Sequence, residues 1–428
     1  MSGLKKIVVL GAGFGGLCAA TQIAKKLRGL GLMQKYEVIL IDKNDHHTYT
    51  PLLYEVATTP KETAGLSRLQ EVATYKINPL ITGLPIKFIQ SEIMALDLVR
   101  GDVHLGDDTE LIADFVVLAL GSETNYFGIA GLKENSLPLK SFGDAVKIRD
   151  AVWNPVAVGQ AEVKIVVGGA GSTGVELAGE FRIWCEKLEK ESGKCRFNVT
   201  LVEAMPTVLP GFEEKVIAIV GTRLKKIGVK MILGKKIVSA KKNEIVLDDG
   251  QKIPFDILVW TGGVKAPSIL SKLPMEKEAQ GRMLVADGLE CLPQTPKLKL
   301  ASMVYGLGDS ICFYNPVTKK PIPGVARAAI IQGGIVAHNI VEEIKMSENK
   351  KYVPHTTYYL PKEYPYIIPV GGKYAVAKFG PIVISGFLGW TLKGLVELNY
   401  LFSIMPLWRA LRVWLKGLKI FVQNDRLG

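Results

Sequence analysis

Two sets of three glycines in this chain have the spacing G-x-G-x-x-G, which suits backbone that must lie close to a phosphate group. Each set follows an apolar, β-branched run, at residues 7–10 in the first case and 165–167 in the second. In such a turn the first glycine permits a tight bend, the second lets the backbone approach a pyrophosphate, and the third lets a helix pack on a strand. The two sets are Gly11, Gly13 and Gly16, and Gly169, Gly171 and Gly174.

An acidic residue closes the next apolar run after each glycine turn. Asp42 follows Gly16 by 26 residues, and Glu203 follows Gly174 by 29 residues. At this place a carboxylate accepts hydrogen bonds from ribose hydroxyls and repels a 2′-phosphate. We therefore predict two dinucleotide sites. Because no arginine directly follows Glu203, we predict that the second site prefers NADH to NADPH.

Three further strand ends carry small or acidic residues. Gly121 follows one apolar run, the pair Gly262 and Gly263 follows another, and Asp309 follows a third, ahead of a helix predicted from about residue 324. This arrangement resembles glutathione-reductase-like flavoproteins with two dinucleotide-binding domains, in which it completes the FAD site. The resemblance implies that the acid bonds the ribityl chain and that the helix dipole stabilises negative charge on reduced flavin.

The elements around these residues predict an α/β chain with two Rossmann-like dinucleotide-binding domains. A buried parallel strand is a continuous apolar run, and a helix must return the chain to the next strand. Because the second glycine turn lies between the first one and Asp309, we predict that the NADH-binding domain is inserted into the FAD-binding domain. The predicted ranges are 1–120 and 291–355 for the FAD-binding domain, 121–290 for the NADH-binding domain, and 356–428 for a C-terminal membrane-association region.

The composition excludes several other classes of protein. The 428 residues include 44 glycines and 48% hydrophobic residues, unlike a disordered or fibrous chain. The five cysteines form no CxxC pair and no Cys/His cluster at zinc spacing, so we predict no disulfide framework and no metal site. The first residues lead directly into an apolar strand, so we expect no secretory signal and a protein that faces the cytosol.

Five segments resemble type II NADH:quinone oxidoreductases, the alternative NADH dehydrogenases that do not pump protons. They occur in that family's order, at residues 49–57, 120–129, 174–180, 202–212 and 260–264. The resemblance implies noncovalent FAD, NADH as donor, a membrane quinone as acceptor and a homodimer. It also implies that Thr50, in the first segment, contacts FAD.

The same resemblance assigns the reaction to Glu176 and Gln332. Glu176 matches the family's glutamate near flavin and quinone, and the alternative is an acid placed there because a helix N-terminus favours negative charge. Gln332 matches the second glutamine of the family's Ala-Gln-x-Ala-x-Gln. Ala328 stands where the first glutamine is expected, beside Arg327. This departure bears on the identity of the acceptor.

Other reactive side chains have ordinary explanations. We expect His46 and His47 to serve loop packing and backbone contacts, not proton transfer. The loop after the first glycine turn lacks the Cys-x4-Cys of disulfide reductases, which argues against a dithiol substrate. A sulfide:quinone oxidoreductase remains an alternative, although Cys291 and Cys312 are poor candidates for its paired redox cysteines. An NADH-sensing flavoprotein with little quinone turnover is a second alternative.

The C-terminal region predicts attachment to a membrane surface. Of the formal charge of +12, half lies in residues 373–428, which hold eight Lys/Arg and two acidic residues. Residues 407–422 form a basic amphipathic helix with tryptophans, as in interfacial helices. The uncharged stretches are too short to span a bilayer, so we predict a peripheral protein on the cytoplasmic face. The alternatives are an ordinary packed helix and, less favoured in the absence of a known motif, nucleic-acid binding. On a helical wheel one apolar arc contains Leu407, Leu411, Trp414, Leu415, Leu418, Phe421 and Val422, whereas Val413 and Ile420 lie off it.

Overall fold

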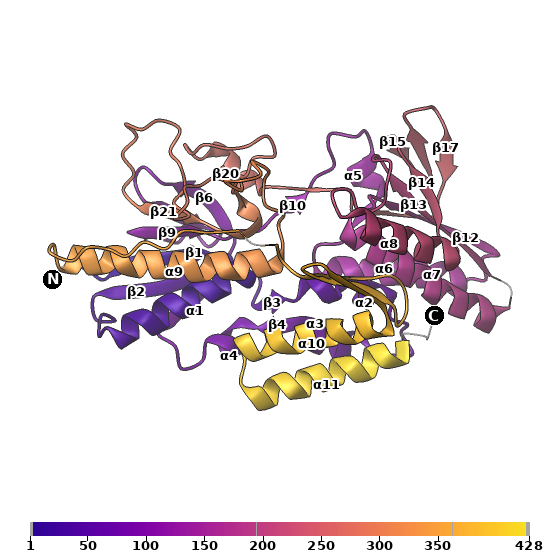
Figure 1. Cartoon of the computed structure of the whole chain (residues 1–428), viewed down its shortest axis with the longest axis horizontal. Coiled ribbons are helices and arrows are strands. Elements are labelled where there is room, and N and C mark those ends of the chain that lie inside the picture. Colours follow the sequence, from indigo (N-terminus) through magenta and orange to yellow (C-terminus); the bar gives the residue numbers. More distant parts are fainter. Residues whose placement is uncertain (1–2, 194, 362, 425–428) are drawn as a thin grey trace. The chain divides into compact units, whose positions relative to one another are not determined.

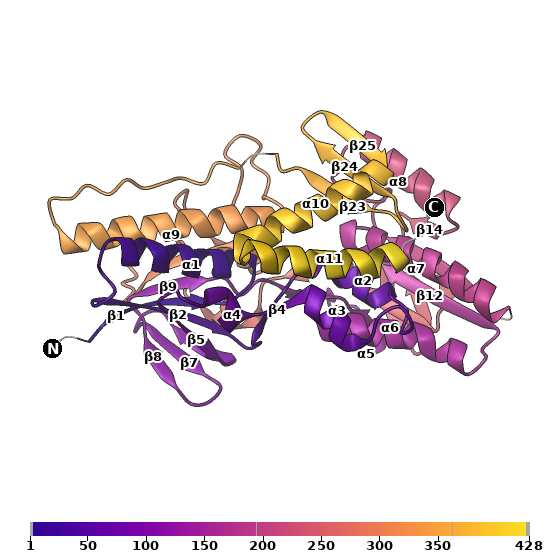
Figure 2. The same cartoon turned by 90° about the horizontal axis from the view of Figure 1, so that it is seen from below.

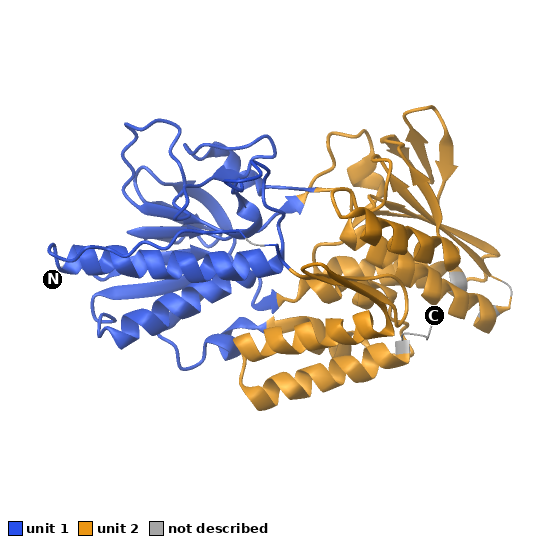
Figure 3. Cartoon of the chain, viewed as in Figure 1, with its two compact units in different colours: residues 1–47, 76–123, 264–364 blue, residues 48–75, 124–263, 365–428 orange. Residues whose placement is uncertain are grey.

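The computed structural model describes residues 3–193, 195–361 and 363–424. The chain divides into two compact units, shown in different colours in Figure 3. The first unit comprises residues 1–47, 76–123 and 264–364, and the second comprises residues 48–75, 124–263 and 365–428. Each unit contains one of the two glycine turns and is described separately below.

The first unit is built on a five-stranded parallel sheet of order β21-β9-β1-β2-β5. Residues Ile7 to Leu10 of its central strand are fully buried, as expected of a continuous apolar run. Two helices, α1 and α9, lie side by side along this unit (Figures 1 and 2). The bounds are β1 (Lys5–Leu10), α1 (Phe14–Gly29), β2 (Tyr36–Asp42), β5 (Ile86–Gln90), β9 (Phe115–Leu118), β21 (Met303–Gly306) and α9 (Ala326–Glu348).

Smaller elements complete the first unit. An antiparallel sheet contains β6 (Ile93–Asp97), β7 (Asp102–Leu105) and β8 (Glu110–Ile112), and a two-stranded parallel pair contains β20 (Met283–Leu284) and β22 (Ile311–Cys312). The remaining short elements are α4 (Ile77–Ile81), η2 (Ser268–Lys272) and η3 (Gly308–Ser310). The last of these carries Asp309 directly after β21.

The second unit repeats the plan of the first with a five-stranded parallel sheet of order β11-β18-β12-β13-β14. A three-stranded antiparallel sheet, β15-β16-β17, packs its apolar side chains against those of the parallel sheet. The bounds are α5 (Leu132–Asn135), β11 (Leu137–Pro138), α6 (Phe142–Ala157), β12 (Glu162–Gly168), α7 (Ser172–Ser192), β13 (Arg196–Glu203), α8 (Glu214–Lys226), β14 (Lys230–Leu233), β15 (Ile237–Lys241), β16 (Glu244–Leu247), β17 (Lys252–Pro254) and β18 (Ile257–Trp260).

The C-terminal part of the second unit is an antiparallel sheet followed by two helices. Helix α10 covers β24, and α11 runs beside α10 and contacts α3 (Figure 2). In the described part of the chain, no helix has the length and apolar character needed to cross a membrane. The bounds are η1 (Thr50–Leu52), α2 (Leu53–Thr58), α3 (Leu66–Ala73), β23 (Tyr366–Pro369), β24 (Ala375–Phe379), β25 (Ile382–Gly386), α10 (Phe387–Ile404) and α11 (Leu407–Asn424). Four shorter strands lie where the chain passes from one unit to the other: β3 (His46–Thr48), β4 (Thr74–Lys76), β10 (Glu123–Thr124) and β19 (Val264–Lys265).

Helix α11 forms where the sequence predicts it, but the predicted apolar arc is divided between two faces. Phe421 is buried, and Trp414 turns inward so that its indole Nε1 donates to the carbonyl oxygen of Gly394 at 2.8 Å. Ile420, predicted to lie off the apolar arc, is buried as well. Leu415, by contrast, is 55% exposed. The predicted apolar arc is therefore not one exposed face, because one edge of it packs against other elements of the second unit.

Candidate functional site

The first glycine turn joins β1 to α1 in a conformation that leaves no room for two of its side chains. Gly11 has φ +104°, and a Cβ at this position would lie 2.4 Å from the carbonyl oxygen of Ala119. A Cβ on Gly16 would lie 1.9 Å from the carbonyl oxygen of Gly11. Both glycines are therefore required for the turn itself.

The middle glycine of this turn is not explained by packing within the chain. A Cβ on Gly13 would have no neighbouring atom within 4 Å. Gly13 is also the N-cap of α1, whose first turn contains no acidic residue. Free N–H groups and the positive end of the helix dipole are therefore directed to this position, which suits a phosphate group.

Asp42 and His47 hold the first turn from two sides. The Oδ2 atom of Asp42 accepts the N–H of Ala12 at 2.8 Å, and Oδ1 accepts the N–H of Asn44 at 2.8 Å. His47 lies 3.0 Å through Nδ1 from the carbonyl oxygen of Ala12. Because burial lowers the pKa of His47 to about 4, the imidazole is neutral at pH 7 and Nδ1 donates this bond. The predicted backbone contact of His47 is confirmed.

Asp309 lies with the other strand ends of the first unit. Its Oδ2 atom accepts the hydroxyl of Ser122 at 2.8 Å, next to Gly121. A Cβ on Gly324 would lie 2.3 Å from Asp309 Oδ1, so the carboxylate lies against the segment that leads into α9. Ser122 was missed in the sequence, although its position directly after Gly121 was a usable signal.

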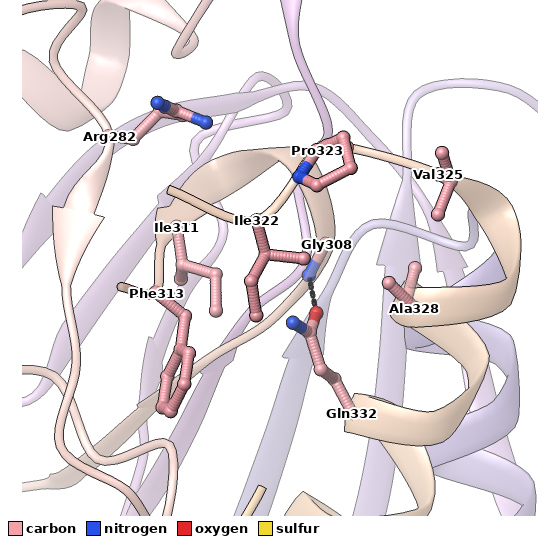
Figure 4. Close-up of a pocket in the computed structure, with 11 residues that line it drawn as sticks. Arg282, Gly308, Ile311, Phe313, Ile322, Pro323, Val325, Ala328 and Gln332 are labelled. Atoms are coloured by element: carbon pink, nitrogen blue, oxygen red, sulfur yellow. Dashed lines mark hydrogen bonds between the residues drawn. The ribbon is translucent and has the colours of Figure 1, made fainter. Parts of the chain in front are cut away.

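The side chain of Gln332 is buried inside the first unit. It is 4% exposed, and its Oε1 accepts the N–H of Gly308 at 2.8 Å, which holds the turn before Asp309 (Figure 4). It lines a small pocket together with Phe313 and Ala328. The neighbouring Arg327 is exposed and forms no hydrogen bond or ion pair with the residues that the structure describes.

The second glycine turn joins β12 to α7 and has the geometry of the first. Gly169 has φ +97°, and its Cβ would lie 2.4 Å from Cα of Gly262. A Cβ on Gly174 would lie 1.9 Å from the carbonyl oxygen of Gly169, whereas one on Gly171 would have no neighbour within 4 Å. Gly171 is the N-cap of α7, as Gly13 is of α1. As in the first turn, packing within the chain does not explain why the middle position, Gly171, is a glycine.

Glu203 corresponds to Asp42 in the second unit. Its Oε2 accepts the N–H of Ala170 at 2.6 Å, and its Oε1 accepts the N–H of Met205 at 2.9 Å. The two glycines after β18 are explained by packing. A Cβ on Gly262 would lie within 2.8 Å of the ring of Trp260, and one on Gly263 within 2.8 Å of the ring of Phe127. Internal packing therefore accounts for Gly262 and Gly263, and their contact with a cofactor stays a prediction.

Glu176 is the fifth residue of α7 and therefore lies beyond the first turn of the helix. The helix dipole falls off within the first turn and would lower the pKa of a carboxyl group. Burial instead raises the pKa of Glu176 to about 8, although its side chain keeps some contact with solvent. Its position beyond the first turn and the raised pKa give no support to an acid held by the helix N-terminus, and the role of Glu176 stays a prediction. Thr50, which the resemblance predicts to contact FAD, is exposed in η1.

The cysteines do not provide redox chemistry in this arrangement. All five are free, and burial raises the pKa of both Cys291 and Cys312. A reactive cysteine must instead be a thiolate near neutral pH. Asp102, His104 and Glu110 are the described residues that could together hold a metal ion, but Arg100 Nε already pairs with Asp102 at 3.1 Å.

Comparison with known proteins relates the chain to flavin- and nicotinamide-dependent enzymes by sequence. The family model described as pyridine nucleotide-disulphide oxidoreductase matches residues 5–333. A type II NADH:quinone oxidoreductase of Staphylococcus saprophyticus is 29% identical, covering 78% of this chain and 82% of that protein. The type II NADH:quinone oxidoreductase Ndh of Mycobacterium tuberculosis is 29% identical, covering 96% of this chain and 87% of that protein.

Two solved structures share the fold. NDH2 from Plasmodium falciparum, solved in complex with NADH, has a TM-score of 0.80 at 16% identity and covers 99% of both chains. The sulfide:quinone oxidoreductase of Aquifex aeolicus has a TM-score of 0.73 at 18% identity, covering 94% of this chain and 91% of that one. At these identities the likeness establishes the fold alone, and the choice of reaction depends on the residues of this chain.

Proposed function

The chain belongs to the pyridine nucleotide-disulphide oxidoreductase family, and from this premise we propose that it transfers a hydride from NADH to FAD and then two electrons to a quinone. One observation carries the proposal. Each unit has a glycine turn with an open middle position, and a carboxylate from the next strand accepts the N–H of the residue after the first glycine. Two such turns predict two dinucleotides in one chain.

The residues of the first unit fit FAD. Gly13 and the N-terminus of α1 would hold the pyrophosphate, and Asp42 the ribose. Asp309, positioned by Ser122 and by the turn that Gln332 holds, would bond the ribityl chain. Gly121 completes the proposed contacts from this unit, whereas a contact of Thr50, a residue of the second unit, with FAD stays a prediction. When bound, FAD would supply the capacity to accept a hydride and pass on two electrons.

The residues of the second unit fit NADH. Gly171 and the N-terminus of α7 would hold its pyrophosphate, and Glu203 would accept its ribose hydroxyls. The negative charge of Glu203 disfavours the 2′-phosphate of NADPH. Gly262 and Gly263 are proposed to border the same site.

A quinone is the proposed acceptor because the relatives from Staphylococcus saprophyticus and Mycobacterium tuberculosis are named for that activity. The net reaction joins NADH, one proton and quinone to give NAD+ and quinol. Glu176, whose pKa lies at about 8, would hold a proton at its carboxyl group at pH 7 and offer it as a hydrogen-bond donor. The burial of Cys291 and Cys312 disfavours a sulfide donor.

Helices α10 and α11 support attachment to a membrane surface. The exposed side chains of α10 carry no charge and include Phe387, Leu388, Leu395 and Phe402. On α11, Trp408 is exposed, and so are the three cations Arg412, Lys416 and Lys419. Apolar and cationic side chains together suit a helix in the interface of an anionic leaflet. We place the protein peripherally on the cytoplasmic face and propose that it is a homodimer.

A reconstitution experiment tests the function. The protein is purified in detergent, its flavin spectrum is recorded, and NADH oxidation is followed with ubiquinone and menaquinone analogues. We expect a yellow protein that NADH bleaches and that quinone reoxidises. A colourless protein that cannot be loaded with FAD would overturn the proposal. Quinone reduction by sulfide without NADH would favour a sulfide:quinone oxidoreductase, and bleaching without turnover would favour an NADH sensor.

A further inference from the structure

A cluster of ionisable side chains is buried in the second unit, at the contact between α10 and α2. Lys393 of α10 forms an ion pair with Glu55 of α2, and the hydroxyl of Tyr54 donates to Glu55 Oε1 at 3.0 Å. The side chain of Glu55 is 2% exposed and that of Lys393 is 16% exposed. The Lys393 ammonium also lies over the rings of Tyr54 and Phe421. These two opposite charges are therefore shielded from solvent and pair through Glu55 Oε1, whereas Glu55 Oε2 is buried without a hydrogen-bond partner among the described residues.

A second carboxyl group, that of Glu397, lies one helical turn after Lys393 on α10. Glu397 is 7% exposed, and the described residues donate no hydrogen bond to its carboxyl group. A charge on Glu397 acts on the hydroxyls of Tyr49 and Tyr75, and Tyr49 stacks on Tyr400 with 5.2 Å between ring centroids. Glu397 thus has uncharged aromatic neighbours in Tyr49, which precedes η1, in Tyr75 of β4 and in Tyr400 of α10.

The described side chains of α11 add no compensating cation to this carboxyl group. The residue of α11 that faces it is Gly417, whose Cβ, if present, would lie 3.7 Å from Glu397 Oε1. The next cation, Lys416, is on the surface and pairs with Glu71 of α3 at 2.7 Å. Among the residues that the structure describes, Lys393 is consequently the one cation that acts on Glu397.

The cluster contains two carboxyl groups and one ammonium group, so its charges balance only when one carboxyl group is protonated. With Glu397 neutral, Glu55 and Lys393 form a complete pair. With Glu397 ionised, one negative charge would remain buried without a partner of its own, which is strongly unfavourable. Burial accordingly raises the pKa of Glu397 to about 7, and Lys393 offsets this only in part.

We propose that Glu55, Lys393 and Glu397 form a one-proton switch that sets how firmly α10 and α11 are seated on residues 48–75. The contact of α10 and α11 with residues 48–75 is tight while the cluster holds its extra proton, and it loosens when that proton is lost. The proposal depends on packing within the second unit alone and is independent of the proposed enzymatic activity.

The direction of the pH effect follows from comparing the packed and the loosened contact of α10 and α11 with residues 48–75. Loosening exposes Glu397 to water, where a carboxyl group has a pKa of about 4.3. The seated form therefore binds the proton more tightly, and its stability falls as the pH rises from this value to about 7, then stays constant. The opening equilibrium of α10 and α11 should increase on the order of a hundredfold across this range.

Amide hydrogen exchange on the full-length, flavin-loaded protein tests the switch between pH 5 and pH 8. After correction for intrinsic exchange rates, we expect protection of α10 and α11 to fall on the order of a hundredfold by pH 7. Glu397→Gln should remove this dependence because the amide has no proton to lose. Glu55→Gln should also remove it, because the charge of Lys393 then neutralises an ionised Glu397 in place of Glu55.

The matched control is Glu71→Gln, which removes a carboxylate that joins α3 to α11 through an exposed pair with Lys416. This variant should keep the full pH dependence of the wild type. Protection that does not change with pH in the wild type would overturn the proposal, and so would a dependence that survives in both Glu397→Gln and Glu55→Gln. If Glu397→Gln does not fold, the Glu55→Gln result alone decides between these outcomes.

Discussion

Glu176 holds its proton to a higher pH than a carboxyl group in water, and this sets the first prediction. Its pKa of about 8 means that the group is neutral at pH 7 and ionises above pH 8. We expect quinone reduction by NADH to decline above pH 8 in the wild type. Glu176→Gln should slow turnover by on the order of tenfold or more and abolish the inflection, because the amide donates a hydrogen bond but no proton.

A second substitution on α7 separates this role from a general effect on the helix. Glu191 is also a glutamate of α7, but it is 59% exposed and lies near the other end of the helix. Glu191→Gln should leave both the rate and its pH profile unchanged, and neither variant should lose FAD. Wild-type kinetics in Glu176→Gln would remove Glu176 from the reaction.

Glu203 governs the second residue-scale prediction, the choice between NADH and NADPH. The wild type should prefer NADH by roughly tenfold or more in kcat/KM, because the carboxylate repels a 2′-phosphate. Glu203→Gln keeps an oxygen for the N–H of Ala170 and removes the charge, so the preference should decrease by a similar factor. Steady-state kinetics with both nucleotides measure this ratio. Equal turnover of the two by the wild type would contradict the assignment.

Residue-level sequence reasoning identified the acids that close the second strands but not the backbone bonds that hold the turns. Asp42 and Glu203 were recognisable because each ends a run of apolar residues after a glycine turn. His47 and Gln332 were both singled out in the sequence, but the partners of their backbone bonds, Ala12 and Gly308, are encoded by no spacing. Such bonds connect segments distant in sequence, so they become visible only when the fold brings the segments together.

At the level of elements, the two strand-turn-helix units can be tested independently. A Cβ on Gly16 or Gly174 would lie 1.9 Å from a backbone oxygen of its own turn. Gly16→Ala should therefore weaken FAD binding, and Gly174→Ala should raise the KM for NADH while FAD is retained. A strain of about 1–3 kcal/mol corresponds to roughly a ten- to hundredfold effect in each case. Flavin absorbance and steady-state kinetics measure the two outcomes.

The control for these alanines is a glycine that has space. A Cβ on Gly221, inside α8, would have its nearest neighbour at 4.0 Å, so Gly221→Ala should change neither flavin content nor KM. Loss of both cofactors in both turn variants would show general unfolding. The separate assignment of the two turns would then lose its support.

The strands and helices around the turns were predictable because burial on both faces demands continuous apolar runs. The orientation of α11 was not, since a helical wheel shows which residues share an arc but not which edge of the arc packs. The chain passes from the first unit to the second after residue 123 and returns at residue 264, whereas the predicted domain boundaries lay at 120 and 290. The second unit also includes residues 48–75, which were predicted to belong to the FAD-binding domain. The short pairs that place residues 264–290, such as β20 with β22, have no periodic signal.

For the whole molecule, the uneven charge distribution should matter more than the total of +12. Half of this excess lies in residues 373–428, which end in α11. An electrostatic contribution to membrane binding is screened by salt, whereas insertion of apolar side chains is not. Binding to vesicles that contain anionic lipid should therefore weaken with added salt but not disappear. Exposed Leu415 and Trp408 would provide the part that remains.

Reversing charge on α11 tests this surface without disturbing the packed side of the helix. Arg412 and Lys419 are exposed, so Arg412→Glu with Lys419→Glu should reduce binding to phosphatidylglycerol-containing vesicles by on the order of tenfold or more while flavin reduction by NADH persists. Lys225→Glu with Lys226→Glu makes the same charge change on α8 and should leave vesicle binding unchanged. Co-sedimentation with vesicles measures both variants. An equal loss in the two would indicate that total charge, and not the C-terminal helix, directs the protein to the membrane. No loss in either would mean that another surface makes the contact.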